Sequence, residues 1–179
     1  MGGVYNGFVN YLFIMVYSAY YLSPLGKLQI SGSDVAISGV AFEGDNGFVA
    51  ESDAANGAGL PPLFDEAIAQ LRAYFAHDLQ VFDLPLQMLG TAFQCRVWGA
   101  LCGVGYGETS TYGAIAQVLG DMKAVRAVGA ANGRNPIAIV VPCHRIIGGN
   151  GALVGYAGGL WRKQWLLEHE RKHNTLTLF

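Results

Sequence analysis

Apolar residues follow two different periods along the chain, and the change of period separates two parts. In the first part, short apolar runs alternate with Gly, Ser, Asp and Pro residues, a pattern typical of strands joined by turns. The strands predicted from these runs are residues 15–22, 27–31 and 35–42. A Gly/Ala/Asp-rich loop is expected over residues 43–62, and residues 63–78 follow with a helical period. The inward face of that helix is predicted to contain Leu63, Ala67, Leu71, Tyr74 and Phe75.

The second part is mainly helical by the same criterion. Its predicted helices are residues 91–104, 110–120, 121–132 and 160–173. The apolar run at residues 137–141 predicts a short buried strand that leads into Cys143, and residues 148–159 predict a Gly-rich loop. On the last helix, the positions predicted to point inward are Leu160, Trp161, Trp165 and Leu166 or Leu167.

The helices at 110–120 and 121–132 meet at a glycine turn, with Asp121 as the predicted N-cap of the second. Such a pair is either a plain helical hairpin or the helix-turn-helix of DNA-binding proteins. Because small residues let a helix approach a groove closely while a long cation inserts, the outward face of the second helix favours DNA binding. That face is predicted to hold Lys123, Arg126, Ala127 and Ala130, and the inward face Met122, Val125, Val128 and Asn132.

These elements predict an α+β protein with two domains that meet near residue 86. The divisions expected are an N-terminal extension of unknown role (1–15), a small α/β domain (16–85) and a mainly helical DNA-binding domain (86–179). Residues 4–22 are almost long and apolar enough to span a membrane, which remains the alternative for this stretch. Their Asn, Gly, β-branched and aromatic residues instead favour a strand that begins near Met15.

Charge is distributed unevenly between the two halves. The chain is 52% hydrophobic, enough for a sizeable core, and its formal net charge is −2. Residues 1–90 contain two basic and nine acidic residues, whereas residues 91–179 contain nine basic and four acidic ones. A basic half in an acidic protein is consistent with a nucleic-acid surface, although an ordinary solvated face explains such an imbalance equally well.

The cysteines show neither a CxxC pair nor a Cys/His spacing suited to zinc, so we predict no metal site. Their odd number, three, indicates a reducing compartment. Cys95 and Cys102 lie seven residues apart on one face of a predicted helix, where free cysteines usually pack as small apolar groups. We therefore interpret both as structural.

Cys143 differs because an imidazole, His144, follows it directly. A thiol becomes a nucleophile as a thiolate, which needs a base or a positive environment. Neighbours in an extended segment point to opposite sides, so His144 needs a bend after Pro142, or a bridging water, to take the proton. A group that orients the imidazole would complete the set, and Glu168 and Glu170 are the candidates.

Further motifs stand in order around this pair: "TAFQCRVWGAL", "YGETSTYGAIAQVLG", "AVRAVGAANGRNP", "NPIAIVVPCHRII" and "GYAGGLWRKQWLLEHE". Through them residues 88–171 resemble the O6-alkylguanine-DNA alkyltransferases, repair proteins that move an alkyl group from guanine to their own cysteine. Residues 16–85 resemble the ribonuclease-H-like N-terminal domain of that family more loosely, in "YYLSPLGKLQI" and "LRAYFAHDLQVFDLPL". Residues 1–14 have no counterpart in this resemblance.

The resemblance implies roles for residues around the thiol. Cys143 would accept the alkyl group, His144 would be its base through a water, and Glu170 would orient the imidazole. Asn135 would brace the turn between the recognition helix and the active-site strand. Because no residue is placed to reverse the thioether, each molecule would act once, without a cofactor.

The resemblance also implies how the lesion is bound. Tyr112 would donate to the flipped guanine or its phosphate, and Arg126 would fill the space that the base leaves. Tyr156 and the backbone around Ala157 would line the pocket, with Lys163 at its edge. The DNA-facing positions are then Arg126, Lys123, Ala127 and Ala130.

The implied function is direct-reversal repair of duplex DNA at O6 of guanine, with O4 of thymine as a second candidate. We expect a cytoplasmic monomer that binds the minor groove. A protein that binds alkylated DNA and flags it for another pathway is the main rival, but such relatives lack the acceptor cysteine, which is present here as Cys143. A cysteine hydrolase, the weaker rival, would need an oxyanion site and turnover on an ester.

Overall fold

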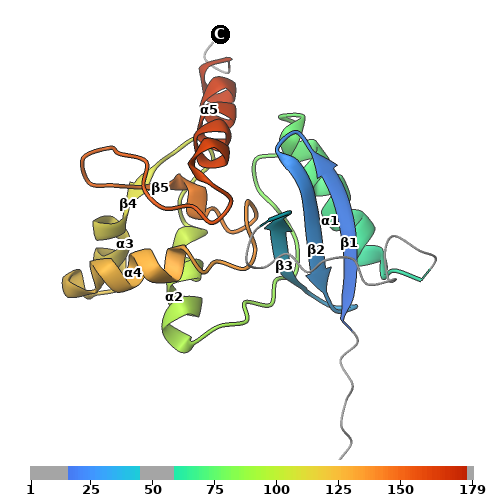
Figure 1. The fold of residues 1–179 in the computed structure, drawn as a ribbon, viewed down its shortest axis with the longest axis horizontal. Coiled ribbons are helices and arrows are strands. Elements are labelled where there is room, and N and C mark those ends of the chain that lie inside the picture. Colours follow the sequence, from blue (N-terminus) through green and yellow to red (C-terminus); the bar gives the residue numbers. More distant parts are fainter. Residues whose placement is uncertain (1–15, 45–58, 177–179) are drawn as a thin grey trace, which may run out of the picture.

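The computed structural model describes residues 16–44 and 59–176 (Figure 1). The predicted extension, residues 1–15, and most of the predicted loop at 43–62 lie outside the described residues. A small sheet with one helix forms one side of the molecule, and the remaining helices form the other. The fold is therefore mixed α+β, as predicted. Within the described part of the chain, no helix is long and apolar enough to cross a bilayer.

The N-terminal side is an antiparallel three-stranded sheet in the order β1-β2-β3, with one helix, α1. Its elements are β1 (Tyr17–Ser23), β2 (Gly26–Gly32), β3 (Ile37–Phe42) and α1 (Pro62–Phe75). The three predicted strands are confirmed. The helix ends earlier than its predicted limit of residue 78, because Ala76 caps it and His77 takes a left-handed φ of 66°.

The C-terminal side consists of helices around one short two-stranded sheet. Its elements are α2 (Ala92–Leu101), β4 (Ser110–Thr111), α3 (Tyr112–Val118), α4 (Val125–Asn132), β5 (Ile146–Ile147) and α5 (Leu160–Leu176). A capping box formed by Thr91 and Gln94 fixes the start of α2. The β4 and β5 strands pair in parallel and bring the chain before α3 beside the chain after Cys143.

The helix-turn-helix region differs in detail from its prediction. Gly120, with a φ of 77°, makes the turn after α3, and Asp121 caps a 3-10 turn, Met122–Ala124, rather than a continuous helix. Met122 therefore does not lie on the inward face, and its side chain is 61% exposed. On α4 itself Val128 and Asn132 are buried, as predicted.

Two other predictions from apolar pattern are wrong. Residues 137–141 do not form a strand: Ile137 makes one bridge to Val40, and the chain then turns through Ile139, whose φ is 72°. Burial without strand pairing explains the apolar run, because Ile137, Ile139 and Val141 are all fully buried. On α5, the expected core residues Leu160 and Trp161 are exposed. Leu166 is buried as predicted, but it shares the inward face with charged and polar residues.

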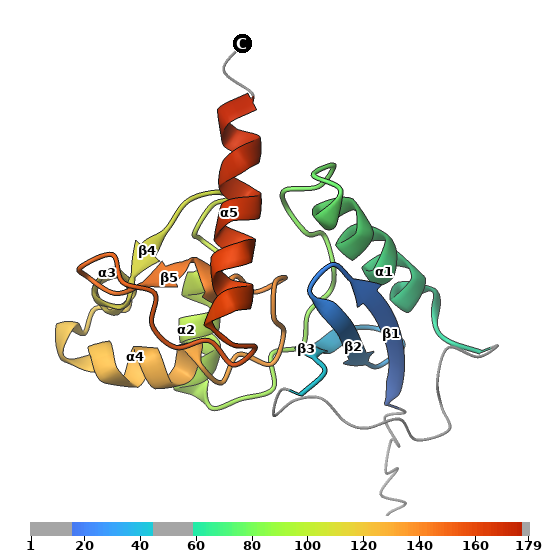
Figure 2. The same cartoon turned by 45° about the horizontal axis from the view of Figure 1, so that its top comes forward.

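The two sides are joined through the edge of β3 (Figures 1 and 2). Residues that connect α1 to α2 run beside it, where Ile37 N donates to Pro85 O over 2.8 Å. Further along, Val40 N donates to Pro136 O and Ala138 N donates to Val40 O. The segment that leads to Cys143 is thus hydrogen-bonded to the N-terminal sheet, which fixes the thiol beside β3.

Candidate active site

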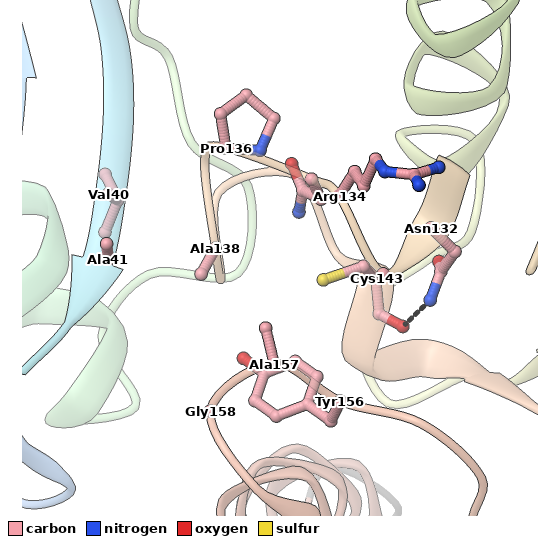
Figure 3. Close-up of a pocket in the computed structure, with 12 residues that line it drawn as sticks. Val40, Ala41, Asn132, Arg134, Pro136, Ala138, Cys143, Tyr156, Ala157 and Gly158 are labelled. Atoms are coloured by element: carbon pink, nitrogen blue, oxygen red, sulfur yellow. Dashed lines mark hydrogen bonds between the residues drawn. The ribbon is translucent and has the colours of Figure 1, made fainter. Parts of the chain in front are cut away.

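Cys143 lies in a pocket of about 280 Å³ between the two sides of the molecule (Figure 3). The walls come from β3, from the segment that follows α4, and from the Gly-rich loop before α5. The Sγ atom points into the space between Ala138 and Ala157. The residues that line the pocket include Val40, Ala41, Asn135, Ala138, Tyr156, Ala157 and Gly158.

A single 3-10 turn, Cys143–Arg145, holds three functional side chains. Pro142 precedes it, and its carbonyl accepts a hydrogen bond from Arg145 N over 3.0 Å. The expected bend after Pro142 is therefore present. Because consecutive side chains fan out around such a turn, Cys143 reaches the pocket while His144 and Arg145 reach the interior.

The His144 imidazole is fully buried and binds Glu170 of α5. Its Nε2 lies 2.8 Å from Glu170 Oε1 and donates to it, which leaves Nδ1 as the nitrogen with a lone pair. Nδ1 is buried and makes no hydrogen bond to any described residue. Of the two candidate orienting carboxylates, only Glu170 contacts the imidazole, since Glu168 accepts a surface hydrogen bond from Gln164.

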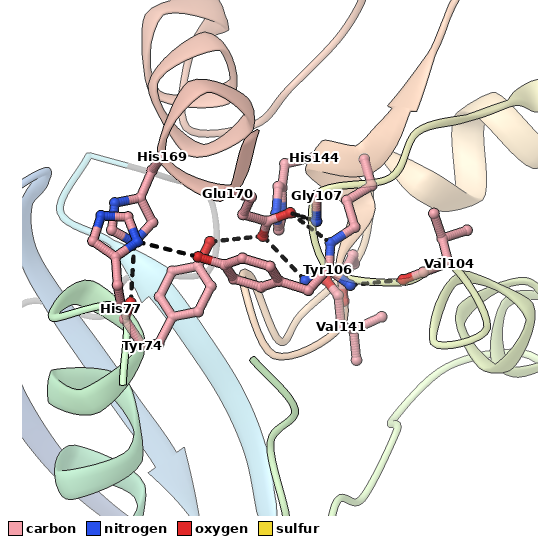
Figure 4. Close-up of polar contacts among 11 residues, drawn as sticks. Tyr74, His77, Val104, Tyr106, Gly107, Val141, His144, His169 and Glu170 are labelled. Carbon is pink, nitrogen blue, oxygen red and sulfur yellow. Dashed lines mark hydrogen bonds and ion pairs between the residues drawn. The ribbon is translucent and has the colours of Figure 1, made fainter. Parts of the chain in front are cut away.

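The Glu170 carboxylate is the centre of a larger buried network (Figure 4). Arg145 donates to both of its oxygens, from Nε to Oε2 over 2.9 Å and from Nη2 to Oε1 over 3.0 Å. The Tyr74 hydroxyl donates to Oε1 over 2.8 Å, and Gly107 N donates to Oε2 over 3.1 Å. Together with His144, five hydrogen bonds hold this carboxylate in one orientation.

This environment fixes the charge of both groups. Burial alone would raise the pKa of Glu170, but the hydrogen bonds from His144 and Arg145, together with the positive charge of Arg145, hold it well below its usual range. Burial lowers the pKa of His144 more than Glu170 raises it, so the imidazole is neutral at rest. A neutral imidazole that is oriented by a carboxylate can accept a proton as a general base.

The thiol needs that acceptor. Burial raises the pKa of Cys143, against the opposing effects of a hydrogen bond from Asn135 and the positive charge of Lys163. Cys143 is therefore a thiol, not a thiolate, at neutral pH. The arrangement can bind an apolar group beside Sγ and remove the thiol proton when a reaction requires it.

Comparison with known proteins identifies the family of the chain. The model of the 6-O-methylguanine DNA methyltransferase ribonuclease-like domain matches residues 16–88, and that of the DNA binding domain of the same family matches residues 92–172. The chain belongs to this family. A methylated-DNA–protein-cysteine methyltransferase of Mycolicibacterium paratuberculosis is 49% identical over 159 residues, which are 88% of this chain and 94% of that protein.

Other methyltransferases of the family agree in sequence and fold. A methylated-DNA–protein-cysteine methyltransferase of Methanosarcina acetivorans is 47% identical over 87% of this chain and 98% of its own length. The crystal structure of Mycobacterium tuberculosis OGT in complex with DNA has a TM-score of 0.79 at 43% identity, covering 88% of this chain and 94% of that one. The predicted family and its two-part fold are confirmed.

Asn135, expected to brace a turn, lies in the wall of the Cys143 pocket. Its Nδ2 donates to Val141 O over 2.8 Å, and its Oδ1 accepts from Ile137 N over 3.0 Å. These bonds close the buried turn that carries Cys143. Asn132 of α4 donates to the Cys143 carbonyl over 3.4 Å, so α4 is hydrogen-bonded directly to the backbone of Cys143.

Tyr112 and Lys163 are not among the residues that line the Cys143 pocket. Both contact the Gly-rich loop instead. The Tyr112 hydroxyl donates to Val154 O over 3.1 Å. Lys163 is fully buried, and its Nζ donates to Val154 O over 2.8 Å and also to the Ile146 carbonyl. Burial lowers the pKa of Lys163 to about 8. Both residues thus hold the loop that supplies Tyr156 and Ala157 to the pocket.

The predicted DNA-facing residues all lie on the solvent side of α4 and of the 3-10 turn before it. Lys123 stands in the 3-10 turn, and Arg126, Ala127 and Ala130 stand on α4, and all four side chains are exposed. No hydrogen bond or ion pair joins the Arg126 side chain to the rest of the described chain. This face of the family's DNA binding domain therefore presents small side chains and two cations.

Sequence reasoning missed Arg145 and Tyr74 as parts of the site. Arg145 stands in "PCHR", and its place directly after Cys143 and His144 was a usable signal. Tyr74 was expected only as a core residue, and nothing in the pattern places its hydroxyl on a carboxylate 96 residues away. Cys95, half-buried, donates to Met88 O, but Cys102 is exposed at the C-cap of α2, contrary to its expected packing.

Proposed function

We propose that the chain repairs duplex DNA by moving an alkyl group from O6 of guanine to Sγ of its own Cys143, once per molecule. Its family membership and the names of its relatives support alkyl transfer to a protein cysteine. The observation that carries the assignment to Cys143 is its position, buried in an apolar pocket and followed by an imidazole that is oriented by Glu170 over 2.8 Å.

The transfer begins with the thiol proton. A water relays it from Sγ to Nδ1 of His144, and the imidazolium that forms is stabilised by the Glu170 carboxylate. The thiolate then attacks the alkyl carbon, a C–S bond forms, and the C–O6 bond breaks with its electron pair on guanine. Guanine takes up the proton from the imidazolium, so the reaction balances without a cofactor. The thioether is stable, and each molecule reacts once.

Access to the lesion requires that the guanine leave the base stack. Unstacking and unpairing cost a few kcal/mol. We propose that α4 binds the minor groove, where Ala127 and Ala130 allow close approach and Arg126 occupies the vacated stack. The flipped base then enters the pocket between Tyr156 and the Ala157 backbone, with Tyr112 at the loop beside it.

We also propose that the protein acts as a monomer, since one chain supplies the pocket, the His144–Glu170 pair and the DNA-facing helix. A nucleophile that must stay a free thiol favours the reducing cytoplasm. Within the described residues, no group of three or more His, Cys, Asp or Glu side chains is arranged around a metal position.

The test is mass spectrometry after the protein is mixed with duplex DNA that contains one O6-methylguanine. We expect one added methyl group on the peptide that contains Cys143 and unmodified guanine in the DNA. Protein that binds the lesion and leaves both partners chemically unchanged would instead identify the rival, a non-catalytic lesion-binding protein. A parallel sample with an O4-methylthymine duplex measures the second candidate lesion.

A further inference from the structure

The N-terminal domain contributes a side chain to the network around Glu170. Tyr74 lies in the last turn of α1, is fully buried, and donates its hydroxyl hydrogen to Glu170 Oε1 over 2.8 Å (Figure 4). This is the same oxygen that accepts the Nε2 hydrogen of His144, also over 2.8 Å. The hydroxyl and the imidazole therefore share one acceptor atom.

The ring of Tyr74 is held by aromatic neighbours from several elements. Phe82 lies at a centroid distance of 5.5 Å, Tyr106 at 6.0 Å in an edge contact, and His169 of α5 at 5.4 Å. His169 Nε2 also lies 3.0 Å from the Tyr74 carbonyl. Because the ring is packed on several sides, the position of its hydroxyl oxygen is fixed. The hydrogen bond to Glu170 is therefore held in place by the packing between the two domains.

We propose that Tyr74 is a positioning residue for alkyl transfer, whose hydroxyl holds the Glu170 carboxylate against His144 and sets how strongly that carboxylate supports the imidazolium. The inference rests on the proposed function, because it concerns the same proton relay. It assigns the N-terminal domain a part in the chemistry in addition to its structural part.

The direction of the effect follows from competition at Oε1. A hydrogen bond from Tyr74 spreads part of the negative charge of that oxygen, which then attracts the His144 hydrogen less. Without the hydroxyl, the carboxylate interacts more strongly with a protonated His144, and the pKa of His144 rises. The base would then be protonated, and unable to accept the thiol proton, at a higher pH than in the wild type.

Other titratable groups face His144 and Glu170, and they stay in place when only the Tyr74 hydroxyl is removed. Arg145 binds both oxygens of Glu170, and Lys163 and Cys143 approach the site from α5 and from the 3-10 turn. Tyr106 faces Glu170 from the segment after α2, and burial raises its own pKa to about 12, so it stays neutral. The change that follows removal of the Tyr74 hydroxyl therefore reports on that hydroxyl.

The experiment compares pH–rate profiles of alkyl transfer for the full chain and for Tyr74→Phe, with a free O6-alkylguanine base as substrate so that DNA binding does not contribute. We expect the acid limb of Tyr74→Phe to move to higher pH by about one unit, since a hydrogen bond to a charged group carries an effect of that order. Tyr21→Phe is the matched control: its ring lies 6.1 Å from Phe75 in the same cluster, and we expect an unchanged acid limb.

The outcomes distinguish a failure of the inference about Tyr74 from a failure of the proposed function. A Tyr74→Phe profile that is lower at every pH, with the wild-type acid limb, would make Tyr74 merely structural and overturn the inference. An acid limb that moves equally in Tyr21→Phe would overturn it as well, because the effect would then belong to the aromatic cluster. If the wild type transfers no alkyl group to Cys143, the proposed function itself is wrong.

Discussion

Two charged regions of the C-terminal domain are built in opposite ways. Around Glu170 the charges are buried, and each has partners at hydrogen-bond distance, as in the contacts of Arg145 and His144. On the solvent face of α4 and of the 3-10 turn before it, Arg126 and Lys123 are exposed, and their side chains lie outside this network. We call the first the relay, meaning Cys143, His144, Arg145 and Glu170, and the second the recognition face, meaning Lys123, Arg126, Ala127 and Ala130.

The difference follows from the function that we propose for each region. A buried charge without a partner is very costly, so burial forces the relay into one geometry, and a proton transfer needs a fixed geometry. A cation that is already paired has little free energy left to gain from DNA, so the recognition face is most effective when its cations stay solvated. Variants in the two regions should therefore separate chemistry from DNA binding.

The largest separation is expected from Cys143→Ala. It should abolish alkyl transfer completely while binding to a methylated duplex stays within a few-fold of wild type, because the recognition face is untouched. Peptide mass spectrometry measures the first, and fluorescence anisotropy with labelled duplex the second. Cys95→Ala and Cys102→Ala are the controls, and both should transfer the alkyl group at the wild-type rate. Methylation that persists in Cys143→Ala would identify Cys95 or Cys102 as the acceptor.

Glu170→Gln should lower the rate by roughly 10²-fold, a typical contribution of general base catalysis. The amide can still orient His144, but it no longer stabilises the imidazolium, so the pKa of Cys143 that governs alkylation should rise. Because the relay serves both substrates, the loss should be equal for a free base and for duplex DNA. A pH–rate profile identical to that of the wild type would remove Glu170 from the mechanism.

The same variant has a stability signature. The pKa of Glu170 is held below its ordinary value in the folded state, so its ionised form stabilises the fold above the ordinary carboxyl range and this contribution is lost as pH falls. Glu170→Gln also leaves Arg145 without its anion, at a cost of about 3 kcal/mol or more. Thermal unfolding should show a lower Tm at neutral pH and a smaller further decrease toward pH 3 than in the wild type.

The recognition face could be read from the sequence, and the relay only in part. The exposed side of α4 followed from helical spacing, because positions that share a side in the predicted spacing also share burial or exposure in the structure. On α5, side-chain polarity and exposure disagree: Lys163, His169 and Glu170 are buried, and Leu160 and Trp161 are exposed. A prediction from hydrophobic pattern places charged residues on the outward face of a helix. This placement is wrong where buried charged residues have hydrogen-bond and ion-pair partners.

The strand predicted at 137–141 failed for a related reason. A short apolar run predicts a buried strand, but Ile137, Ile139 and Val141 are buried in a segment that turns instead of pairing. The bonds that close the turn come from Asn135, a side chain whose bracing role was implied only by the family resemblance. Contacts between distant segments, such as that of Tyr74 with Glu170, leave no local pattern at all.

Arg126→Ala should have a smaller effect, which depends on the substrate. With a free O6-alkylguanine base the rate should match the wild type, because no base has to leave a stack. With duplex DNA the rate should fall about tenfold or more, since each ~1.4 kcal/mol of uncompensated unstacking is a factor of ten. Equal losses on both substrates would mean that Arg126 supports the fold or the relay, and its role in the duplex would have to be abandoned.

The smallest effect is expected from Lys123→Ala. Lys123 lies in the 3-10 turn before α4, with its backbone N–H capped by Asp121 and its side chain exposed, which suits a phosphate contact outside the groove. Loss of one such contact should weaken binding to methylated and unmethylated duplex alike. It should also reduce the slope of log affinity against log salt by about 0.9, the value for one phosphate contact on B-form DNA. Lys123→Arg should retain the slope, because it keeps the charge. A slope unchanged in Lys123→Ala, measured by anisotropy over a salt series, would leave Arg126 as the cation of the recognition face that contacts DNA.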